Sequence, residues 1–271
     1  MPWSKLKNII LVILVITNLC LLAQVALPAI QSRRLLDQTR EQAIQFLQGR
    51  GVQLDEGTVP QSIDLSPQVA ERDLAGEERA AAALLGSPVT AEARGGEVYR
   101  YFNERGSIQF HSDGACSAQL EPEQFPLGED RAAGCLALLK RMGLTGDILE
   151  EEGDTLIFRQ NWEGTPLFTQ QVTLVCQGDG LAAIATGRQL LAAPQPDPTR
   201  RTVTVATALI DLLNGVGALG DVCNRVDAIE AGYVTSASLS GAALLTPVWR
   251  VTTDTGAYQL DAVTGGVSRV S

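Results

Sequence analysis

The sequence predicts an α+β protein that begins with a transmembrane helix and continues into repeated modules, each a helix laid on an antiparallel sheet. Three observations support this fold class. Residues 9–30 are almost entirely apolar. Several later segments carry apolar residues at helical spacing, and others alternate with the period of two that is typical of strands. A helix laid across a curved antiparallel sheet buries the apolar faces of both.

The apolar run reads IILVILVITNLCLLAQVALPAI and contains no charged residue. A helix needs about 20 apolar residues to cross a hydrocarbon core of roughly 30 Å, so we expect residues 9–30 to span the membrane once, in contact with membrane lipid. A cleaved signal peptide is the alternative. Its apolar run is shorter, about 7–15 residues, and ends at a small-x-small site that this sequence lacks. Cys20 also lacks the small preceding residue of a lipoprotein signal.

The basic residues on the two sides of the span are nearly balanced, so the positive-inside rule gives little preference. A short head stays inside more readily than a long domain does. We therefore expect residues 1–8 to be a cytoplasmic head and the C-terminal domain to be extracytoplasmic. The flanking charges are Lys5 and Lys7 before the span, and Arg33, Arg34 and Arg40, with Asp37 and Glu41, after it.

Three residues near or within the span are candidate contacts with a partner helix: Trp3, Asn18 and Gln24. We expect Trp3 at the cytoplasmic interface, where amphipathic rings gather. Amides within a membrane form hydrogen bonds between helices worth about 0.6–2 kcal/mol, so we expect Asn18 and Gln24 to face another transmembrane helix. The alternative is that lipid tolerates a single amide without a partner.

The chain has a net charge of −10, and residues 1–34 carry four basic residues and no acid, so the region after them carries −14. An acidic surface repels phosphate backbones and anionic polymers. Nucleic acid and anionic cell-wall polymer are therefore disfavoured as partners. The same charge suits a soluble extracytoplasmic domain.

Four cysteines lie after the span and are candidates for disulfides outside the cytosol, with three connectivities open. No two of them have C-x-x-C spacing and the chain has one histidine, so we expect no metal site. For the cysteines with apolar neighbours, the alternative is that they are small buried hydrophobic residues. The four candidates are Cys116, Cys135, Cys176 and Cys223.

The region after the span first reads as helix, loop and helix, followed by three strands. Residues 33–50 carry an apolar stripe that glycines close. Residues 55–75 are rich in Pro, Asp, Ser and Gly, which predicts a loop. The other expected elements are a short strand at 52–54, a helix at 77–85, and strands at 98–102, 107–111 and 115–120 joined by hairpin turns.

The helix-then-strands pattern then occurs twice more. Acids at its start and bases at its end favour a helix from Glu129 to Arg141, since they complement the helix dipole. A second apolar stripe predicts a helix that begins at Val205 and stops at Gly215. Strands are expected at 155–160, 165–176, 181–187, 226–232, 244–252, 256–261 and 266–270.

These elements suggest a division into segments with different roles. After the head and the span, we expect one α+β module at 31–128 and a second at 129–271. The second consists of two helix–meander halves with a proline-rich linker near 192–200. Helix plus meander thus occurs about three times, as a repeat of pattern and not of identity. The three copies are expected at 78–120, 129–187 and 202–271.

Several short motifs resemble those of one bacterial family when they are taken in order. They are Pro2 to Ile10, Asn18-Leu19, Arg50-Gly51-Val52, Val59-Pro60, Gln160 to Phe168, Gly232-Tyr233, Pro247 to Val251, Gly256-Ala257-Tyr258 and Asp261 to Gly266. With the anchor, this set resembles the YycI-type proteins (YycH/YycI family) of Gram-positive bacteria over most of the chain. The last motif is also similar to a hairpin of PepSY and cystatin-like domains, which implies modules of that fold. The chain departs from the family in its many Ala and Gly residues and in its cysteines.

The resemblance implies a non-enzymatic, membrane-anchored regulator that acts in signal transduction. Such proteins act, with a YycH-like protein, on the sensor histidine kinase of a WalK/YycG-like two-component system that controls the cell wall. They restrain the kinase through contacts between transmembrane helices and between extracytoplasmic domains. The alternative is a surface-anchored PepSY-like binding or inhibitory domain that acts on a protease or a cell-wall ligand.

We expect no catalytic residue, cofactor site or metal site. His111, Ser112 and Asp113 are adjacent in sequence, and adjacent residues on a strand and a turn cannot converge as a catalytic triad, so they predict a hairpin turn. The carboxylates from Glu150 to Asp154 are typical of a solvated acidic run. The glycines from Gly215 to Gly220 follow a helix, whereas a phosphate-binding loop follows a strand.

Overall fold

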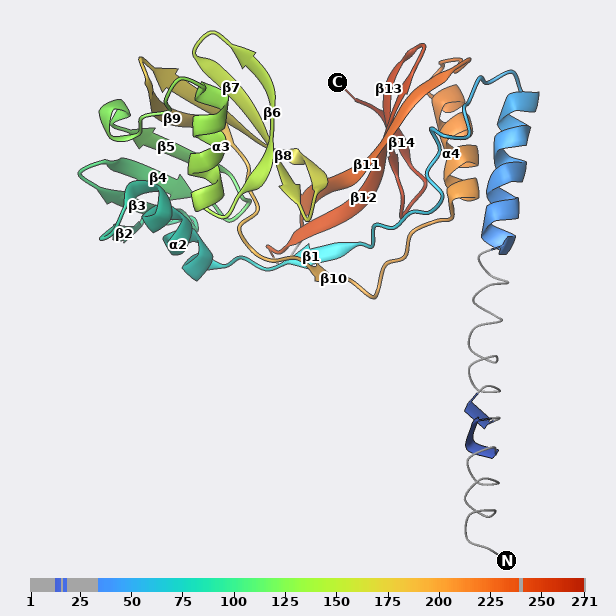
Figure 1. Cartoon of the computed structure of the whole chain (residues 1–271), viewed down its shortest axis with the longest axis horizontal. Coiled ribbons are helices and arrows are strands. Elements are labelled where there is room, and N and C mark those ends of the chain that lie inside the picture. The colour runs from blue at the N-terminus through green and yellow to red at the C-terminus, as the bar shows by residue number, and fades with distance from the viewer. Residues whose placement is uncertain (1–12, 16, 19–33, 239–240, 271) are drawn as a thin grey trace, which may run out of the picture.

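The computed structural model describes residues 13–15, 17–18, 34–238 and 241–270. It has a mixed α+β fold with a large sheet and few helices, which confirms the α+β part of the predicted fold class. Figure 1 shows two lobes with β8, β11 and β12 between them.

The first lobe is formed by residues 74–191 and contains the same unit twice, a helix followed by four strands. The first unit consists of α2 (Leu74–Leu85), β2 (Thr90–Ala93), β3 (Tyr99–Asn103), β4 (Gly106–Phe110) and β5 (Cys116–Leu120). The second consists of α3 (Arg131–Arg141), β6 (Thr145–Glu152), β7 (Thr155–Trp162), β8 (Thr165–Gln177) and β9 (Gly180–Gly187), with a short 3-10 turn, η1 (Pro122–Gln124), before it.

One antiparallel sheet runs through both units because β5 pairs with β9, with Ala118 opposite Ile184. The helices α2 and α3 contact each other. The core of this lobe combines buried side chains of both units, from Ala80 of α2 to Ile184 of β9. Residue 128, where a boundary between modules was predicted, therefore lies inside this lobe. The sheet and the buried core contain residues from both sides of it.

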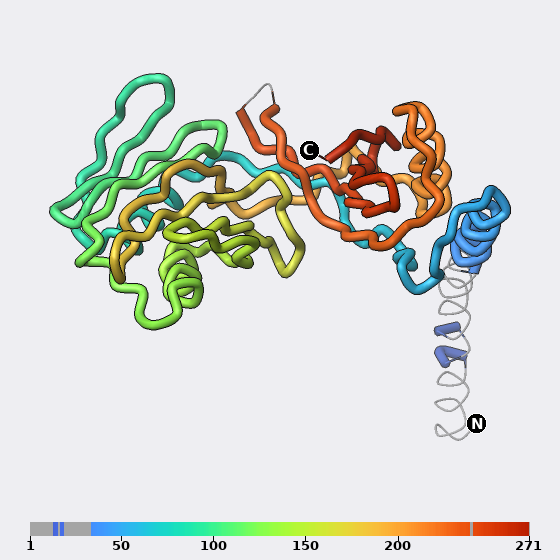
Figure 2. Tube along the Cα trace, turned by 90° about the horizontal axis from the view of Figure 1, so that it is seen from above, coloured from blue at the N-terminus to red at the C-terminus, as the bar shows by residue number. Residues whose placement is uncertain are grey.

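The second lobe is assembled from two stretches of chain that are distant in sequence, residues 43–63 and 203–267. Ile44 and Leu47 of a helix at residues 34–49 are 1% exposed and share a core with Trp249. The 34–49 helix lies beside α4, as Figures 1 and 2 show. The later elements of this lobe are α4 (Val205–Ala218), β11 (Val226–Ala237), β12 (Ala243–Thr253), β13 (Gly256–Asp261) and β14 (Val267–Arg269).

The two lobes meet through strand pairing and through two connecting segments. β8 pairs in parallel with β11, with Leu167 opposite Tyr233. The connectors contain β1 (Gln68–Ala70) and β10 (Gln195–Pro196), which pair with each other, and β1 also pairs with β12. A small cluster that includes Leu167, Tyr233 and Leu245 fills the joint. The first lobe is therefore an insertion within the second.

Four strands of the structure were not predicted. β10 lies in the proline-rich segment near 192–200 that was predicted as a linker. β1 lies inside the segment 55–75 that was predicted as a loop. All four residues of β2 are exposed and β6 is mostly exposed, so neither shows the alternation of a half-buried strand. The other predicted strands and helices are found within a few residues of their expected bounds, except that residues 52–54 form only a bridge between Gln53 and Arg225.

The predicted stop of the α4 helix at Gly215 is wrong, because α4 continues to Ala218. A Cβ at Gly215 would lie 2.4 Å from the Cβ of Val267 in β14. Glycine is needed there for close packing of the helix on the strand, and not as a terminator. The first residue with a positive φ after α4 begins is Gly220, which lies beyond the end of the helix.

Gly232 of β11 makes a close contact at the joint. A Cβ there would lie 2.6 Å from Cε2 of Phe168 and 2.7 Å from the carbonyl oxygen of Pro166. We predict that Gly232→Ala lowers the free energy of unfolding by about 1–3 kcal/mol, because the added methyl overpacks the joint. Thermal or urea unfolding of the full chain in detergent micelles, followed by circular dichroism, measures the change.

Gly217→Ala is the matched control. Gly217 lies on α4 with no atom within 4 Å of the new Cβ, so alanine is expected to raise the free energy of unfolding by about 0.5–1 kcal/mol. A Gly232→Ala variant as stable as the Gly217→Ala variant would contradict the close contact at the joint.

Candidate functional site

A cavity of about 70 Å³ lies between the two lobes. Its walls come from the connector before α2, the turn between β4 and β5, strand β8, the segment after β9 and the ends of β11 and β12 that face each other. Polar side chains that line it are Glu71, Arg72, Asp73, Glu77, His111, Ser112, Asp113, Gln170, Arg188, Gln189, Thr235 and Ser236.

Arg72 and Glu77 form an ion pair in one wall of the cavity, with side chains 20% and 7% exposed. Nε and Nη2 of Arg72 donate to the two carboxylate oxygens at 2.6 and 3.0 Å, and Nη1 donates to the carbonyl oxygen of Glu97 at 2.7 Å. The guanidinium also lies over the ring of Tyr99, 5.3 Å from its centroid. The hydrogen bond to Glu77 raises the pKa of Arg72. Arg72 is thus a fixed, compensated charge.

Two glutamines of the cavity are buried with hydrogen-bonding atoms left unused. Gln189 is 4% exposed, and neither Oε1 nor Nε2 has a nitrogen or oxygen partner among the described residues. Gln170 is 3% exposed and its Oε1 likewise has none. Its Nε2 donates to Oγ1 of Thr235 at 2.6 Å, which ties β8 to β11. Leaving such a buried atom unsatisfied costs about 1–3 kcal/mol, and all three atoms are shielded from solvent.

His111, Ser112 and Asp113 lie at the edge of the cavity, in the turn between β4 and β5, as predicted. Asp113 accepts a hydrogen bond from the backbone N–H of Ala115 at 3.0 Å and one from Nη2 of Arg188 at 3.1 Å. No side-chain hydrogen bond within the described part of the chain joins the three residues to one another. Asp113 therefore closes the turn and neutralises Arg188.

Cys116, Cys135, Cys176 and Cys223 are free, and the first three are buried. Cys135 of α3 and Cys176 of β8 interact through their thiols, whereas the sulfur of Cys116 accepts a weak hydrogen bond from the amide of Gln189. Burial raises the pKa of Cys116 and of Cys135 to about 12. Their surroundings are those of small hydrophobic residues, and disulfide formation stays a prediction.

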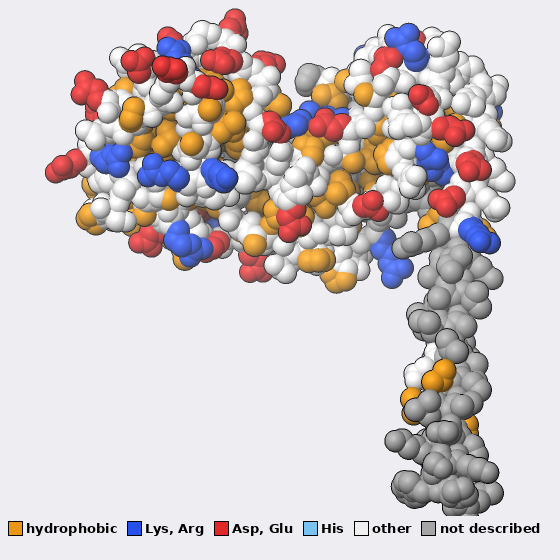
Figure 3. All heavy atoms as spheres, in the orientation of Figure 1, with side chains coloured by type: hydrophobic (Ala, Val, Ile, Leu, Met, Phe, Trp, Pro, Cys, Tyr) orange, Lys and Arg blue, Asp and Glu red, His pale blue; other side chains and the backbone are white. Residues whose placement is uncertain are grey.

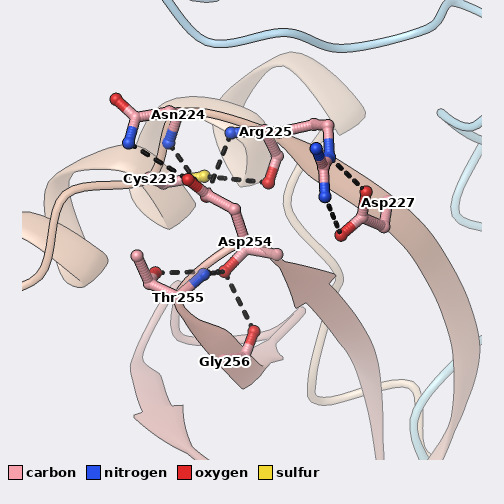
Figure 4. A network of polar contacts seen from close by, with 8 residues as sticks. Cys223, Asn224, Arg225, Asp227, Asp254, Thr255 and Gly256 are labelled. Carbon is pink, nitrogen blue, oxygen red and sulfur yellow. Dashed lines mark hydrogen bonds and ion pairs between the residues drawn. The ribbon is translucent and has the colours of Figure 1, made fainter.

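Cys223 is less buried and lies in the loop before β11, in the polar network of Figure 4. Asp254 holds this loop. Its Oδ1 accepts from the backbone N–H groups of Asn224 and Arg225 at 3.0 and 3.1 Å, and its Oδ2 accepts from Nδ2 of Asn224 at 3.0 Å. The backbone N–H of Gln53 donates to the carbonyl of Asn224 at 2.7 Å. The network thus joins the two stretches of the second lobe.

Arg40 ties the 34–49 helix to the loop that follows it. Its Nε donates to the carbonyl oxygen of Pro60 at 3.0 Å, and its Nη2 donates to those of Glu56 at 2.8 Å and Val59 at 2.7 Å. One guanidinium therefore satisfies three backbone carbonyls, and this fixes the rotation of the helix about its axis relative to the loop. We call this contact the Arg40 clamp.

The 34–49 helix is buried only in its C-terminal half. Leu35 and Leu36 are 66% and 52% exposed, whereas Ile44 and Leu47 are 1% exposed. The helix therefore docks on the second lobe through its last turns and leaves its first turns uncovered by the described residues.

Most of the residues predicted to make membrane contacts lie outside the described part of the chain. Trp3 and Gln24 lie outside the described residues, and Asn18 lies in a short described stretch that is helical and exposed. In the described parts of the chain, no helix is both long enough and apolar enough to cross a membrane. The membrane contacts of Trp3, Asn18 and Gln24 stay predictions.

Charged side chains of both signs lie over both lobes on the face that Figure 3 shows. Several form exposed ion pairs, such as Arg131 with Asp154 at 3.0 Å. Pairs of this kind contribute about 0–1 kcal/mol and define no site. Across the described ranges, no three His, Cys, Asp or Glu side chains gather where a metal ion could bind.

The sequence did not indicate the cavity or the Arg40 clamp. Both depend on residues far apart in the chain that only the fold brings together. One signal was present: Gln170 occupies the face of β8 that carries Phe168, Val172 and Leu174, so a polar residue stands among apolar ones. A buried amide in an apolar row points to a specific hydrogen-bonding role.

Comparisons with known proteins leave the family open. No family model matches the chain, and no curated protein matches it significantly. Among solved structures, an uncharacterized protein from Eubacterium rectale is 13% identical, with a TM-score of 0.42, over 76% of this chain and 86% of that one. The C-terminal domain of YpeB from Bacillus megaterium is 10% identical, with a TM-score of 0.37, over 74% of this chain and 99% of that one. Likenesses at this level carry no functional argument, and the YycI-type resemblance stays a prediction.

The buried thiols lead to a labelling prediction. We predict that iodoacetamide at pH 8, with a reductant present, leaves Cys116 and Cys135 unmodified in the folded full chain, because a thiol with a pKa of about 12 is protonated and shielded. Cys223, which is partly exposed, serves as the internal control and reacts first. Mass spectrometry of tryptic peptides measures the order, and early labelling of Cys135 would contradict the packing of α3.

The same pKa shifts predict a loss of stability at alkaline pH. These thiols have a pKa near 9 in the unfolded chain and about 12 in the folded chain, so at these pH values half of each thiol is ionised. The stability that the neutral thiols contribute is therefore complete below about pH 9 and is lost as the pH rises towards 12. Urea unfolding at several pH values checks this, and a Cys116→Ala variant should show a shallower decline.

Proposed function

We propose that this chain is a non-enzymatic, membrane-anchored regulator with extracytoplasmic lobes. In this proposal residues 9–30 cross the cell membrane, with the N-terminus in the cytoplasm. The chain restrains the sensor histidine kinase of a WalK/YycG-like two-component system that controls the cell wall, and it acts together with a YycH-like protein. The contacts with the kinase are made by transmembrane helices and by the lobes.

The observation that carries the proposal is the docking of the 34–49 helix, which follows the proposed span closely in sequence. A regulator that biases a kinase between two arrangements must present its membrane helix in a defined orientation. The Arg40 clamp and the buried Ile44 and Leu47 hold the 34–49 helix rigidly on the second lobe, and in this proposal that helix passes its orientation on to the span. An inert tether has no need of such a connection.

We also propose that each helix-plus-four-strand unit is a PepSY/cystatin-like module. The order of elements supports this proposal, because one helix precedes four strands three times in the chain. The units are α2 with β2–β5, α3 with β6–β9, and α4 with β11–β14.

A second candidate function is a surface-anchored binding or inhibitory domain that acts on a protease or a cell-wall ligand. The observation that favours it is the cavity between the lobes. The two functions differ in what the anchor does. An inhibitory domain keeps its activity as the fragment 35–271, whereas the kinase regulator loses it.

A replacement of the span tests the first function. We predict that replacing residues 9–30 with a poly-leucine helix of equal length, while the lobes are kept, releases the kinase and raises the output of a kinase-dependent reporter. The double variant Asn18→Leu and Gln24→Leu should give part of the same rise, because it removes the amides that we expect to face a partner helix. Unchanged output from the poly-leucine chain, at equal expression, would refute contact through the span.

A substitution in the clamp tests whether the lobes control the helix. We predict that Arg40→Met lowers the free energy of unfolding by about 1–3 kcal/mol, because three carbonyls lose a charged donor, and that it raises reporter output. Amide hydrogen exchange should become faster in residues 34–60.

Arg34→Met is the matched control, since it removes the same charge from an exposed position of the same helix. Equal effects of Arg34→Met and Arg40→Met on the reporter would mean that charge, and not the clamp, controls signalling.

A further inference from the structure

The side of the 34–49 helix that faces away from the second lobe carries no charge. Its other side, with Ala43, Ile44 and Leu47, is buried against the lobe. With 3.6 residues per turn, the free side presents residues that are all exposed and all uncharged: Leu35, Gln38, Thr39, Gln42, Gln45 and Phe46. The charged residues lie elsewhere around the helix, at Arg34, Asp37, Arg40 and Glu41. In a chain with a net charge of −10, an uncharged helix side that the lobe does not cover is a candidate interaction surface.

Four of these residues recur with the spacing of a two-stranded coiled coil. Leu35, Thr39, Gln42 and Phe46 are separated by four, three and four residues, which is the alternation of the inward positions of a heptad. Leu35 is 66% exposed. Phe46 is 45% exposed, although the guanidinium of Arg50 lies 5.0 Å from the centroid of its ring. We call these four residues the outer seam.

Each residue of the outer seam can face its own counterpart in a second copy of the chain. Leucine and phenylalanine pair with themselves by apolar contact. The amide of Gln42 has donors and an acceptor, so an identical amide is a complete partner. The hydroxyl of Thr39 donates to the carbonyl oxygen of Leu35 at 2.6 Å and can still accept. A partner selected by opposite charge would need charges on this side of the helix, so the composition of the seam favours a second copy.

The shape of the molecule leaves room for such a pair. Figures 1 and 2 show the 34–49 helix at the outer end of the second lobe, with the first lobe at the far end of the molecule. Two copies that meet along the seam therefore carry their lobes outward. Four side chains from each copy form a smaller contact than the roughly 1,200 Å² of a stable interface in solution. Pairing thus depends on anchors that hold both helices parallel and concentrate them in one bilayer.

We propose that the outer seam pairs with the same seam of a second copy, which makes the chain a parallel homodimer with its lobes on the outside. This inference rests on the membrane anchor of the proposed function and not on the kinase as its target. The residues that carry it are those of the 34–49 helix alone.

Photo-crosslinking of the full chain tests the pair. The chain carries p-benzoylphenylalanine in place of Thr39 or Gln42 in the seam, or of Asp37 or Glu41 outside it, and is reconstituted at low density in vesicles of phosphatidylethanolamine and phosphatidylglycerol. We expect light to join two copies at least fivefold more from the seam positions, and mass spectrometry to place the link in residues 34–50 of the second copy. Equal crosslinking from all four positions, or links to the lobes, would overturn the proposal.

The same variants in the membranes of expressing bacteria test the other occupants of this surface. We expect the link from the Gln42 position to join a second copy there too. A link to a different protein in place of the second copy would assign the seam to that partner and overturn the homodimer.

Leu35→Glu and Leu36→Glu form a matched pair of variants. Each places a carboxylate on an exposed leucine of the same helical turn, since the two residues are 66% and 52% exposed. Only Leu35 belongs to the seam, where two like charges would face each other. We expect Leu35→Glu to lower the crosslinking from the Gln42 position at least fivefold and Leu36→Glu to leave it within twofold. Equal effects of the two variants would overturn the proposal.

Extraction of the vesicles with sodium carbonate separates a failure of the anchor from a failure of the pair. A chain that leaves the vesicles refutes the anchor and, with it, the parallel pair. A chain that stays in the bilayer without the seam link refutes the pair alone and leaves the proposed function standing.

Discussion

The joint between the lobes depends on the ring of Phe168. The Arg250 guanidinium of the second lobe lies 4.0 Å from its centroid, and the Arg159 guanidinium of the first lobe lies 5.7 Å from it. Gly232 leaves room for the edge of the ring. Burial lowers the pKa of Arg250, and Arg159 lies 3.3 Å from Glu230. Each cation–π contact is worth about 0.5–2 kcal/mol. One aromatic ring therefore connects both lobes next to the single residue pair, Leu167 with Tyr233, that joins β8 to β11.

The cavity follows from the position of this ring. Gln170 is two residues beyond Phe168 on the same face of β8. The contacts that hold the Phe168 ring in place therefore also position the Gln170 amide. The hydrogen bond from Gln170 to Thr235 crosses the same joint. The cavity and the ring thus lie at the same joint between the lobes.

Most of the fold could be predicted from local patterns, and the parts that could not are those in which distant residues decide. Period-two alternation marks β8 because one of its faces is buried, while β2 and β6 lack that contrast. The assignment of Gly215 as a helix stop failed because its role is contact with Val267, which comes from the end of the chain. Gln170 and Gln189 carry no motif, and their importance arises from burial that only the assembled joint creates.

The paired connectors place the entrance and the exit of the first lobe side by side. Gln68 of β1 lies opposite Pro196 of β10, and neighbouring strands are about 4.8 Å apart. A segment whose two ends almost touch can be excised, and the gap closed by a tight turn, with little entropic cost. The first lobe is thus an insertion that can be replaced as a unit. The second lobe, which packs against the 34–49 helix, can carry different inserted domains in its place.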